Sequence, residues 1–188
     1  LLQPRSRWSL VQNADDLDVL AKLAIGRADQ RVVIAGSGVD TAMFSPTPLP
    51  REACADATVT VLFVARLLRD KGIHELVDAA AQLKHSQPQV RVLIAGGCDA
   101  DNPSAMSETQ VRAWSEAGLI EWLGRCETMS QVYARADIVC LPSYREGLPK
   151  ALLEGAACGR ALVATDVPGC REVCRHEQTG LLVPPRDS

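Results

Sequence analysis

The sequence has few aromatic residues, almost no excess of charge and no long apolar run. Aromatic residues make up 4% of the 188 positions. The 20 basic and 23 acidic residues give a net charge of −3, so bulk electrostatics would not draw the chain to nucleic acid. No uncharged apolar stretch reaches the roughly 18 residues of a membrane-spanning helix. The first residues also lack a signal-peptide core. We therefore expect a cytoplasmic protein, and the initial Leu suggests a piece of a longer chain.

Cysteine is present, but its pattern is not typical of a disulfide framework or a zinc site. The number is odd, at seven, and no Cys-x-x-Cys pair occurs. Cys170 and Cys174 are spaced to share a helix face, yet only His176 lies nearby in the sequence as a further ligand. We expect free thiols in a reducing compartment and no metal. The seven are Cys54, Cys98, Cys126, Cys140, Cys158, Cys170 and Cys174.

Apolar residues are plentiful, at 47%, and their arrangement predicts the fold. Short apolar runs alternate with helical patterns, which is typical of parallel βα units. We predict an α/β fold with a doubly wound, Rossmann-like parallel sheet of about six strands in the order 3-2-1-4-5-6. The strands are expected at residues 59–65, 90–96, 119–124, 137–142, 161–166 and 179–184.

The start of the chain differs from this regular part. A helix is expected over residues 13–26 with Asn13 as its N-cap, and a strand over 31–36. The next stretch has no periodicity and contains three prolines, which indicates a linker. The predicted division is a remnant of a second α/β domain over 1–35, a linker over 36–58 and the six-stranded domain over 59–188.

A doubly wound sheet binds its ligand at the carboxyl ends of the strands, where the strand order reverses. Here that place lies between the first and fourth predicted strands. The loop after the first strand carries Arg66, Arg69 and Lys71, and the loop after the fourth carries Glu146. The predicted strand order therefore brings these cations and this carboxylate into one crevice.

The segment "SYREGLPKALLE" adds a second carboxylate, Glu154, separated from Glu146 by seven residues. Between them, Gly147 permits close approach of the backbone, and Pro149 suits the first position of a helix whose free N–H groups attract anions. The two cations Arg66 and Lys71 suit a diphosphate, and the carboxylate oxygens of Glu154 can accept hydrogen bonds from ribose hydroxyls. Taken singly, these residues are more often ordinary surface charges. Together in one crevice, they favour a long polyhydroxylated anion as the ligand.

Several segments resemble a known family. "ARLLRDKGIHELVDAA", "IAGG", "LPSYREGLPKALLEGAACGRALVATDVPGCREV" and "TGLLV" are similar to the carboxy-terminal donor domain of group 1 (family four) retaining glycosyltransferases. These enzymes have a two-domain B-type fold. The resemblance covers residues 31–184, and "GSGVDTAMFSP" looks like the family's interdomain linker. The chain departs from the family pattern at Gly155, where the family has alanine.

The resemblance implies a nucleotide-sugar donor, with UDP favoured, a glycan or lipid-linked acceptor and no metal requirement. It also implies retention of configuration at the transferred sugar. Carried onto this chain, the resemblance assigns binding of the diphosphate to Arg66 and Lys71, and binding of the ribose to Glu154. It assigns contact with the transferred sugar and a catalytic role to Glu146, with backbone contacts from Gly147 and Leu148 nearby. The residues that it places at the border of the base are Gly96, Gly97 and Arg125.

Two other readings stay open. A sugar-nucleotide epimerase of the same architecture would bind a similar ligand, and so would a non-catalytic nucleotide-binding module. The resemblance also implies an acceptor-binding amino-terminal domain beyond this sequence. We therefore expect the chain to be inactive alone, to associate peripherally with a membrane in its full-length form, and to self-associate through residues 1–35.

Overall fold

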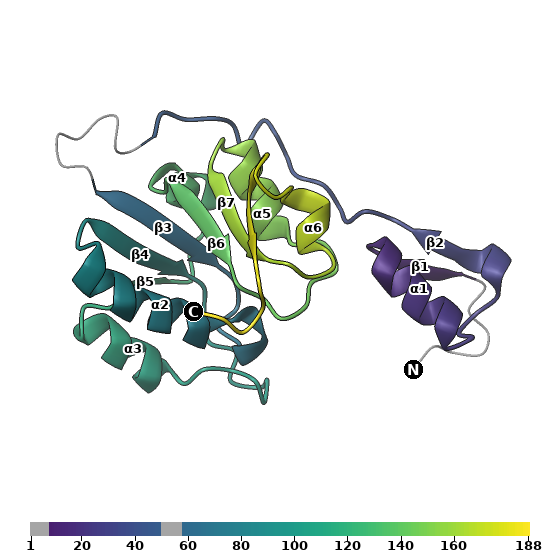
Figure 1. Ribbon diagram of the computed structural model, residues 1–188, viewed down its shortest axis with the longest axis horizontal. Coiled ribbons are helices and arrows are strands. Elements are labelled where there is room, and N and C mark those ends of the chain that lie inside the picture. The colour runs from purple at the N-terminus through teal and green to yellow at the C-terminus, as the bar shows by residue number, and fades with distance from the viewer. Residues whose placement is uncertain (1–7, 50–57) are drawn as a thin grey trace.

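The computed structural model describes residues 8–49 and 58–188. The larger part is a six-stranded parallel sheet in the order β5-β4-β3-β6-β7-β8 (Figure 1). This confirms the predicted order, with its reversal between β3 and β6. The strands are β3 (Val59–Val64), β4 (Val90–Ala95), β5 (Glu121–Gly124), β6 (Ile138–Leu141), β7 (Ala161–Thr165) and β8 (Gly180–Val183).

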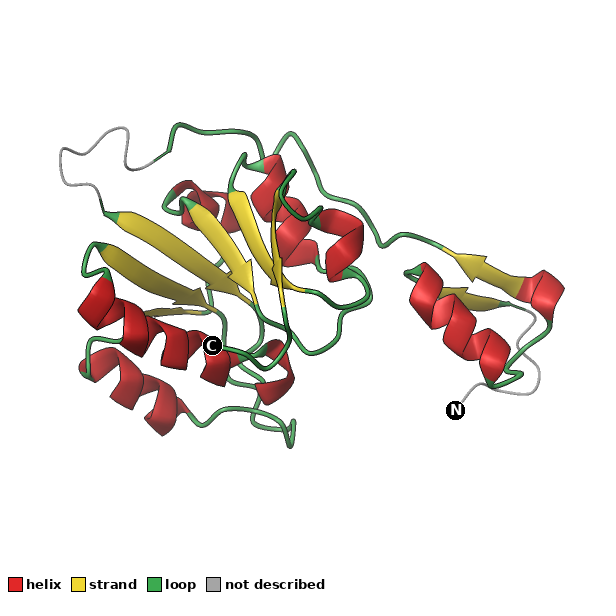
Figure 2. Cartoon of the chain, viewed as in Figure 1, coloured by secondary structure: helices red, strands yellow, loops and turns green. Residues whose placement is uncertain are grey.

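Helices cover both faces of this sheet (Figure 2). Right-handed crossovers place α2 and α3 on one face, and α4, α5 and α6 on the other (Figure 1). Helices α2 to α5 lie where helical patterns alternate with the apolar runs of the sequence, whereas α6 was not predicted. The helices are α2 (Ile73–Ser86), α3 (Glu108–Glu116), α4 (Met129–Ala134), α5 (Lys150–Ala157) and α6 (Cys170–Val173).

The core lies between the sheet and its two helical layers. In the central strand β3, neighbouring Leu62 and Phe63 are both fully buried, because a parallel strand is covered on both faces. Helix α5 packs closely on β6 at Gly155. A Cβ atom there would lie 2.7 Å from Cγ2 of Val139. The departure from the family's alanine thus accompanies a close helix–strand contact.

The amino-terminal part forms a small parallel βαβ unit of β1 (Ser9–Val11), α1 (Ala14–Lys22) and β2 (Arg31–Val33). Asn13 caps α1 as predicted, its Oδ1 accepting from the Asp16 N–H at 2.8 Å. Strand β1 was missed, since three residues are too few to show a period. The strand expected over 31–36 ends at Val33.

The apolar side chains of this unit are largely open to solvent. Helix α1 buries none of its residues. Leu10, Leu23 and Ile34 are each more than half exposed, at 63%, 64% and 51%. That this unit is a remnant of a second domain stays a prediction. Residues 1–7 of the predicted 1–35 unit lie outside the described residues, and self-association through the unit stays a prediction.

The predicted linker is more than a spacer. Residues 36–49 contain no helix or strand, as expected, but Phe44 is only 5% exposed and joins the core of the larger domain. Its ring meets Tyr133 edge-on, with centroids 5.8 Å apart. Buried Arg160 donates to the Thr47 carbonyl oxygen at 2.8 Å. Residues 50–57, including Cys54, lie outside the described residues.

Within residues 8–49 and 58–188, no helix has the length and apolar character needed to cross a membrane.

The buried position of Phe44 predicts a large effect on stability. Phe44→Ala should lower the free energy of unfolding by about 3–5 kcal/mol, because it removes a buried ring and leaves a cavity. Met43→Ala is the control, since the Met43 side chain is 60% exposed and should matter little. Urea unfolding measures both values. Similar small losses in the two variants would show that the segment does not contribute to the core.

Candidate functional site

The loops after β3 and β6 meet at the edge where the strand order reverses. Gly72 makes this possible. Its φ is +72°, and a Cβ atom there would lie 2.0 Å from the Pro142 carbonyl oxygen. A residue with a side chain would therefore be both strained and blocked. The Tyr144 N–H also donates to the Asp70 carbonyl oxygen at 2.9 Å, which ties the two loops together a second time.

The loop contact brings Lys71 next to Glu146. Nζ of Lys71 lies 2.6 Å from Oε1 of Glu146. The Ser143 hydroxyl donates to the same oxygen at 2.6 Å. The two charged side chains are mostly buried, at 22% and 12% exposure. A cation and a carboxylate predicted from separate loops thus form one unit, and partial burial strengthens their attraction.

Arg66 lies beside this pair but takes a different partner. Its Nη1 is 2.9 Å from Oδ2 of Asp99, which follows β4. Asp99 was not singled out from the sequence. The Arg66 side chain is 63% exposed, so the ion pair is weak and easily exchanged for a bound anion. Arg69, from the same loop, is exposed and forms part of neither cavity described next.

A crevice of about 230 Å³ lies between these loops and the start of α5. The crevice is lined by three residues that the sequence analysis placed there, Arg66, Lys71 and Glu146. It is also lined by Lys150, a cation that the sequence analysis did not single out. Pro149 is the N-cap of α5, which corrects the expectation that it occupies the first helical position. The crevice thus gathers three cations near a helix amino terminus, an arrangement suited to an anion.

A larger cavity of about 570 Å³ adjoins the crevice at Arg66. Its wall includes Gly96, Gly97 and Arg125, which follow β4 and β5. Gly96 allows β3 and β4 to continue side by side, because a Cβ atom there would lie 1.8 Å from the Ala65 carbonyl oxygen. A Cβ atom at Gly97 would meet open space. The three positions expected to border a base therefore share one wall.

Glu154 is buried one helical turn beyond Lys150. The Tyr133 hydroxyl, itself fully buried, lies 2.9 Å from its Oε2. Oε1 is 3.5 Å from Nζ of Lys150. Burial and the neighbouring Glu154 carboxylate raise the pKa of Tyr133, so the phenol stays protonated and can donate. One oxygen of Glu154 is thus held by the protein, and the other faces an exposed lysine.

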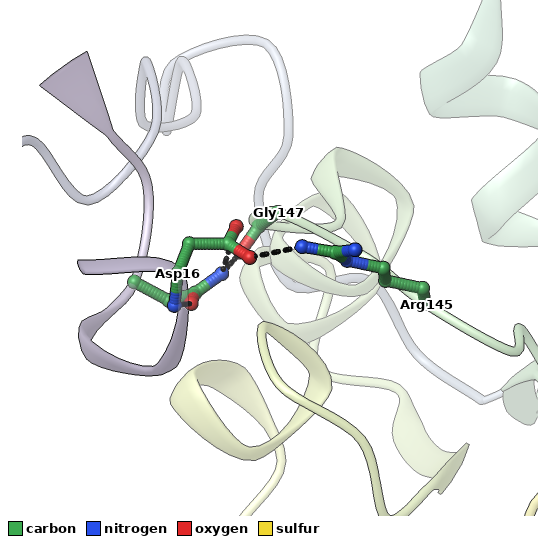
Figure 3. Close-up of polar contacts among 4 residues, drawn as sticks. Asp16, Arg145 and Gly147 are labelled. Atoms are coloured by element: carbon green, nitrogen blue, oxygen red, sulfur yellow. Dashed lines mark hydrogen bonds and ion pairs between the residues drawn. The ribbon is translucent and has the colours of Figure 1, made fainter. Parts of the chain in front are cut away.

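Gly147 contacts the amino-terminal unit, and Leu148 contacts the start of the linker. Nδ2 of Asn13 donates to the Gly147 carbonyl oxygen at 2.8 Å, and Arg145 pairs with Asp16 at 2.5 Å (Figure 3). Leu148 packs against Gly36, whose added Cβ would lie 2.4 Å from Cδ2 of the leucine. The start of α1 therefore holds the Glu146 loop from outside. These contacts join residues some 130 positions apart, so no local pattern predicted them.

A metal site is not evident in the part of the chain that the structure describes. Residues 8–49 and 58–188 contain no group of three or more potential ligands among His, Cys, Asp and Glu. Burial raises the pKa of Cys140 and of Cys170 to about 12, so both remain protonated thiols at neutral pH. That the protein needs no metal stays a prediction.

The Tyr133–Glu154 contact should contribute to stability. Tyr133→Phe removes the hydroxyl and should lower the free energy of unfolding by about 1–3 kcal/mol, since a buried carboxylate loses a donor. Urea unfolding of Tyr133→Phe, Glu154→Ala and the double variant gives the coupling energy. An equal cost of Tyr133→Phe with and without Glu154 would contradict the contact.

Comparison with known proteins agrees with this geometry. Residues 58–188 match the family described as Glycosyl transferases group 1. A D-inositol 3-phosphate glycosyltransferase of Mycobacteroides abscessus is 35% identical over 189 positions, covering 93% of this chain and 40% of the relative. The N,N'-diacetylbacillosaminyl-diphospho-undecaprenol alpha-1,3-N-acetylgalactosaminyltransferase of Campylobacter jejuni is 35% identical, covering 67% and 31%. The chain thus spans less than half the length of these relatives.

Solved structures have the same fold. Sucrose-phosphate synthase from Thermosynechococcus elongatus superimposes with a TM-score of 0.78 at 28% identity, over 95% of this chain and 45% of that one. The Anabaena protein HepE, in complex with UDP-glucose, gives 0.78 at 25%, over 97% and 51%. These comparisons give no support to the epimerase alternative. With a family match over more than half its length, and relatives that share its fold, this chain belongs to the group 1 glycosyltransferases.

Proposed function

We propose that residues 59–188 bind the nucleotide-diphosphate sugar of a retaining glycosyltransferase, with UDP as the nucleotide. The observation that carries the proposal is the Lys71–Glu146 pair, 2.6 Å apart at the junction of two loops. It sets a phosphate-binding cation beside a carboxylate able to accept from sugar hydroxyls. The HepE complex with UDP-glucose, a neighbour of the same fold, supports this choice of donor.

The donor has a place in each part of the site. The base would occupy the 570 Å³ cavity between Gly96, Gly97 and Arg125. The diphosphate would lie in the crevice at the start of α5, where Arg66, Lys71 and Lys150 balance its charge without a metal. The transferred sugar would then meet Glu146 and the backbone of Gly147 and Leu148.

Glu154 would hold the ribose through a single free oxygen. Its Oε2 is engaged by Tyr133, so Oε1 is the acceptor left for a hydroxyl. Lys150 must turn away from Oε1 to admit the ribose, and its 67% exposed side chain is free to do so. The same movement would bring Lys150 to the diphosphate.

In the reaction we propose, the bond from the sugar C1 to the β-phosphate oxygen breaks. A bond from C1 to the acceptor oxygen forms on the same face, and the acceptor proton passes to the departing phosphate. Arg66 and Lys71 stabilise the negative charge that develops on the leaving group. This front-face course is proposed from the family resemblance.

The acceptor would be a glycan or a lipid-linked sugar. The name of the Campylobacter jejuni relative places its acceptor on diphospho-undecaprenol, which supports a lipid-linked acceptor. A cytoplasmic protein that meets the membrane surface is part of the same proposal. Transfer needs the acceptor within about 3–3.5 Å of C1. We propose that an additional acceptor domain provides this, and that the present chain alone binds the donor without transferring it.

Nucleotide binding tests the proposal directly. Arg66→Ala and Lys71→Ala should each weaken UDP binding by about 1.5–3 kcal/mol, the scale of a charged hydrogen bond. Arg69→Ala is the matched control, because this exposed side chain comes from the same loop and lines neither cavity. Calorimetric titration with UDP and GDP measures the affinities. Unchanged affinity in both site variants would refute the assignment.

Substitutions of Glu146 and Glu154 should affect ligand binding in different ways. Glu154→Gln should weaken binding of free UDP, because the ribose loses a charged acceptor. Glu146→Gln should leave UDP affinity nearly unchanged but remove the added affinity of UDP-glucose, since this residue meets the sugar. Titrating both ligands into each variant compares the losses. Equal losses of UDP affinity would contradict the division of roles.

A further inference from the structure

A third cavity, of about 630 Å³, adjoins the donor crevice across Lys71 and Glu146. Its wall contains four cationic side chains and two carboxylates. Arg66, Lys71 and Glu146 belong to both spaces, whereas Arg145 and Arg186 belong to this cavity and not to the crevice. Because Glu146 is the residue assigned to the transferred sugar, this third cavity lies beside the place proposed for that sugar.

Three of the four cations already have acidic partners. Lys71 pairs with Glu146, Arg145 with Asp16 and Arg66 with Asp99. Among the described residues, Arg186 has no carboxylate within ion-pair distance. The other carboxylate of the wall is Asp70. Within the described part of the chain, Arg186 is thus the one cation of this wall that has no acidic partner.

Arg186 is also held in an unusual backbone conformation. Its φ is +63°, in the left-handed region that favours glycine. Strained positions of this kind cluster at ligand sites, because the surrounding structure must hold them in place. Here the guanidinium carbon lies 4.8 Å from the centroid of the Tyr144 ring. This is a cation–π contact that leaves the N–H groups of the arginine available to a ligand.

The Tyr144 ring that Arg186 contacts is held in place by two hydrogen bonds. Its hydroxyl donates to Oε1 of Glu75 in α2 at 2.6 Å. Its backbone N–H donates to the Asp70 carbonyl oxygen at 2.9 Å. The ring is therefore anchored at both ends, and the arginine above it has a defined position at the cavity wall.

We propose that this cavity binds an anionic group, phosphate or carboxylate, adjacent to the transferred sugar, and that Arg186 is the residue that selects it. The inference rests on the proposed function. The shared chemistry is an oxyanion facing a planar guanidinium, which pairs well with both groups. Its two possible sources are a phosphate on the acceptor and a carboxylate on the sugar of the donor.

Three variants separate this role from folding. Arg186→Gly removes the guanidinium and suits the left-handed backbone, so the fold should be kept. Arg186→Lys keeps the charge. Arg175→Ala is the control for losing one positive charge, because Arg175 is exposed and does not line the cavity. All three should bind UDP as tightly as the unaltered chain.

Two titrations then identify the source. The first compares UDP-glucuronate with UDP-glucose, and a preference for glucuronate points to the donor sugar. The second adds inorganic phosphate to the UDP-saturated protein at constant ionic strength, with chloride as the reference anion, and specific binding points to the acceptor. In one of the two titrations, Arg186→Gly should weaken anion binding about tenfold, the effect of one charge-assisted contact. Arg186→Lys should lose less, because it keeps the charge without the planar fork, and Arg175→Ala should change the affinity little.

The outcomes distinguish the two proposals. Normal UDP binding with no effect of Arg186→Gly in either titration would overturn the anion site alone. An equal loss in Arg175→Ala would also overturn it, since net charge would then explain the result. Failure of the unaltered chain to bind UDP would overturn the proposed function and this inference together.

Discussion

The close contact between the loops after β3 and β6 is the constraint on which the rest of the site depends. Gly72 lies so near the Pro142 carbonyl oxygen that no side chain fits between them. Because the loops touch there, Lys71 reaches Glu146, and the crevice and the third cavity both open around that pair. A residue with a Cβ atom at this position would separate the loops and with them the cation and the carboxylate.

The site is supported from behind by a chain of buried contacts that begins in the linker. Phe44 packs edge-on against Tyr133, and Tyr133 donates to Glu154 on α5. Helix α5 in turn lies close to β6 through Gly155. The position of the carboxylate assigned to the ribose therefore depends on a segment that leads into the domain from the amino-terminal unit. The amino-terminal unit also contacts the loop that carries Glu146, through the hydrogen bond that Asn13 donates to the Gly147 carbonyl oxygen.

Among the residues that the structure describes, the cations Arg66, Lys71, Lys150 and Arg145 of the crevice and the third cavity each pair with a carboxylate, and Arg186 does not. Arg66 and Lys150 are the exposed members of their ion pairs, so both cations can exchange their carboxylate for phosphate oxygens at little cost. The pair of Lys71 and Glu146 is more buried, so it is a fixed part of the site. Donor binding on this view replaces weak internal pairs with stronger charge-assisted contacts.

The sequence by itself determined the sheet, its strand order and the crevice residues Arg66, Lys71 and Glu146, together with the Asn13 cap. Each follows from a local pattern, such as apolar runs, helix spacing or a capping residue, combined with the rule that ligands bind where strand order reverses. Only the tertiary structure decided that Phe44 is buried, that Tyr133 holds Glu154 and that Arg186 lies over Tyr144. These contacts join residues that are far apart in the chain. Nothing in the local sequence marks such partners, because long-range packing is set by the folded sheet and not by propensity or periodicity.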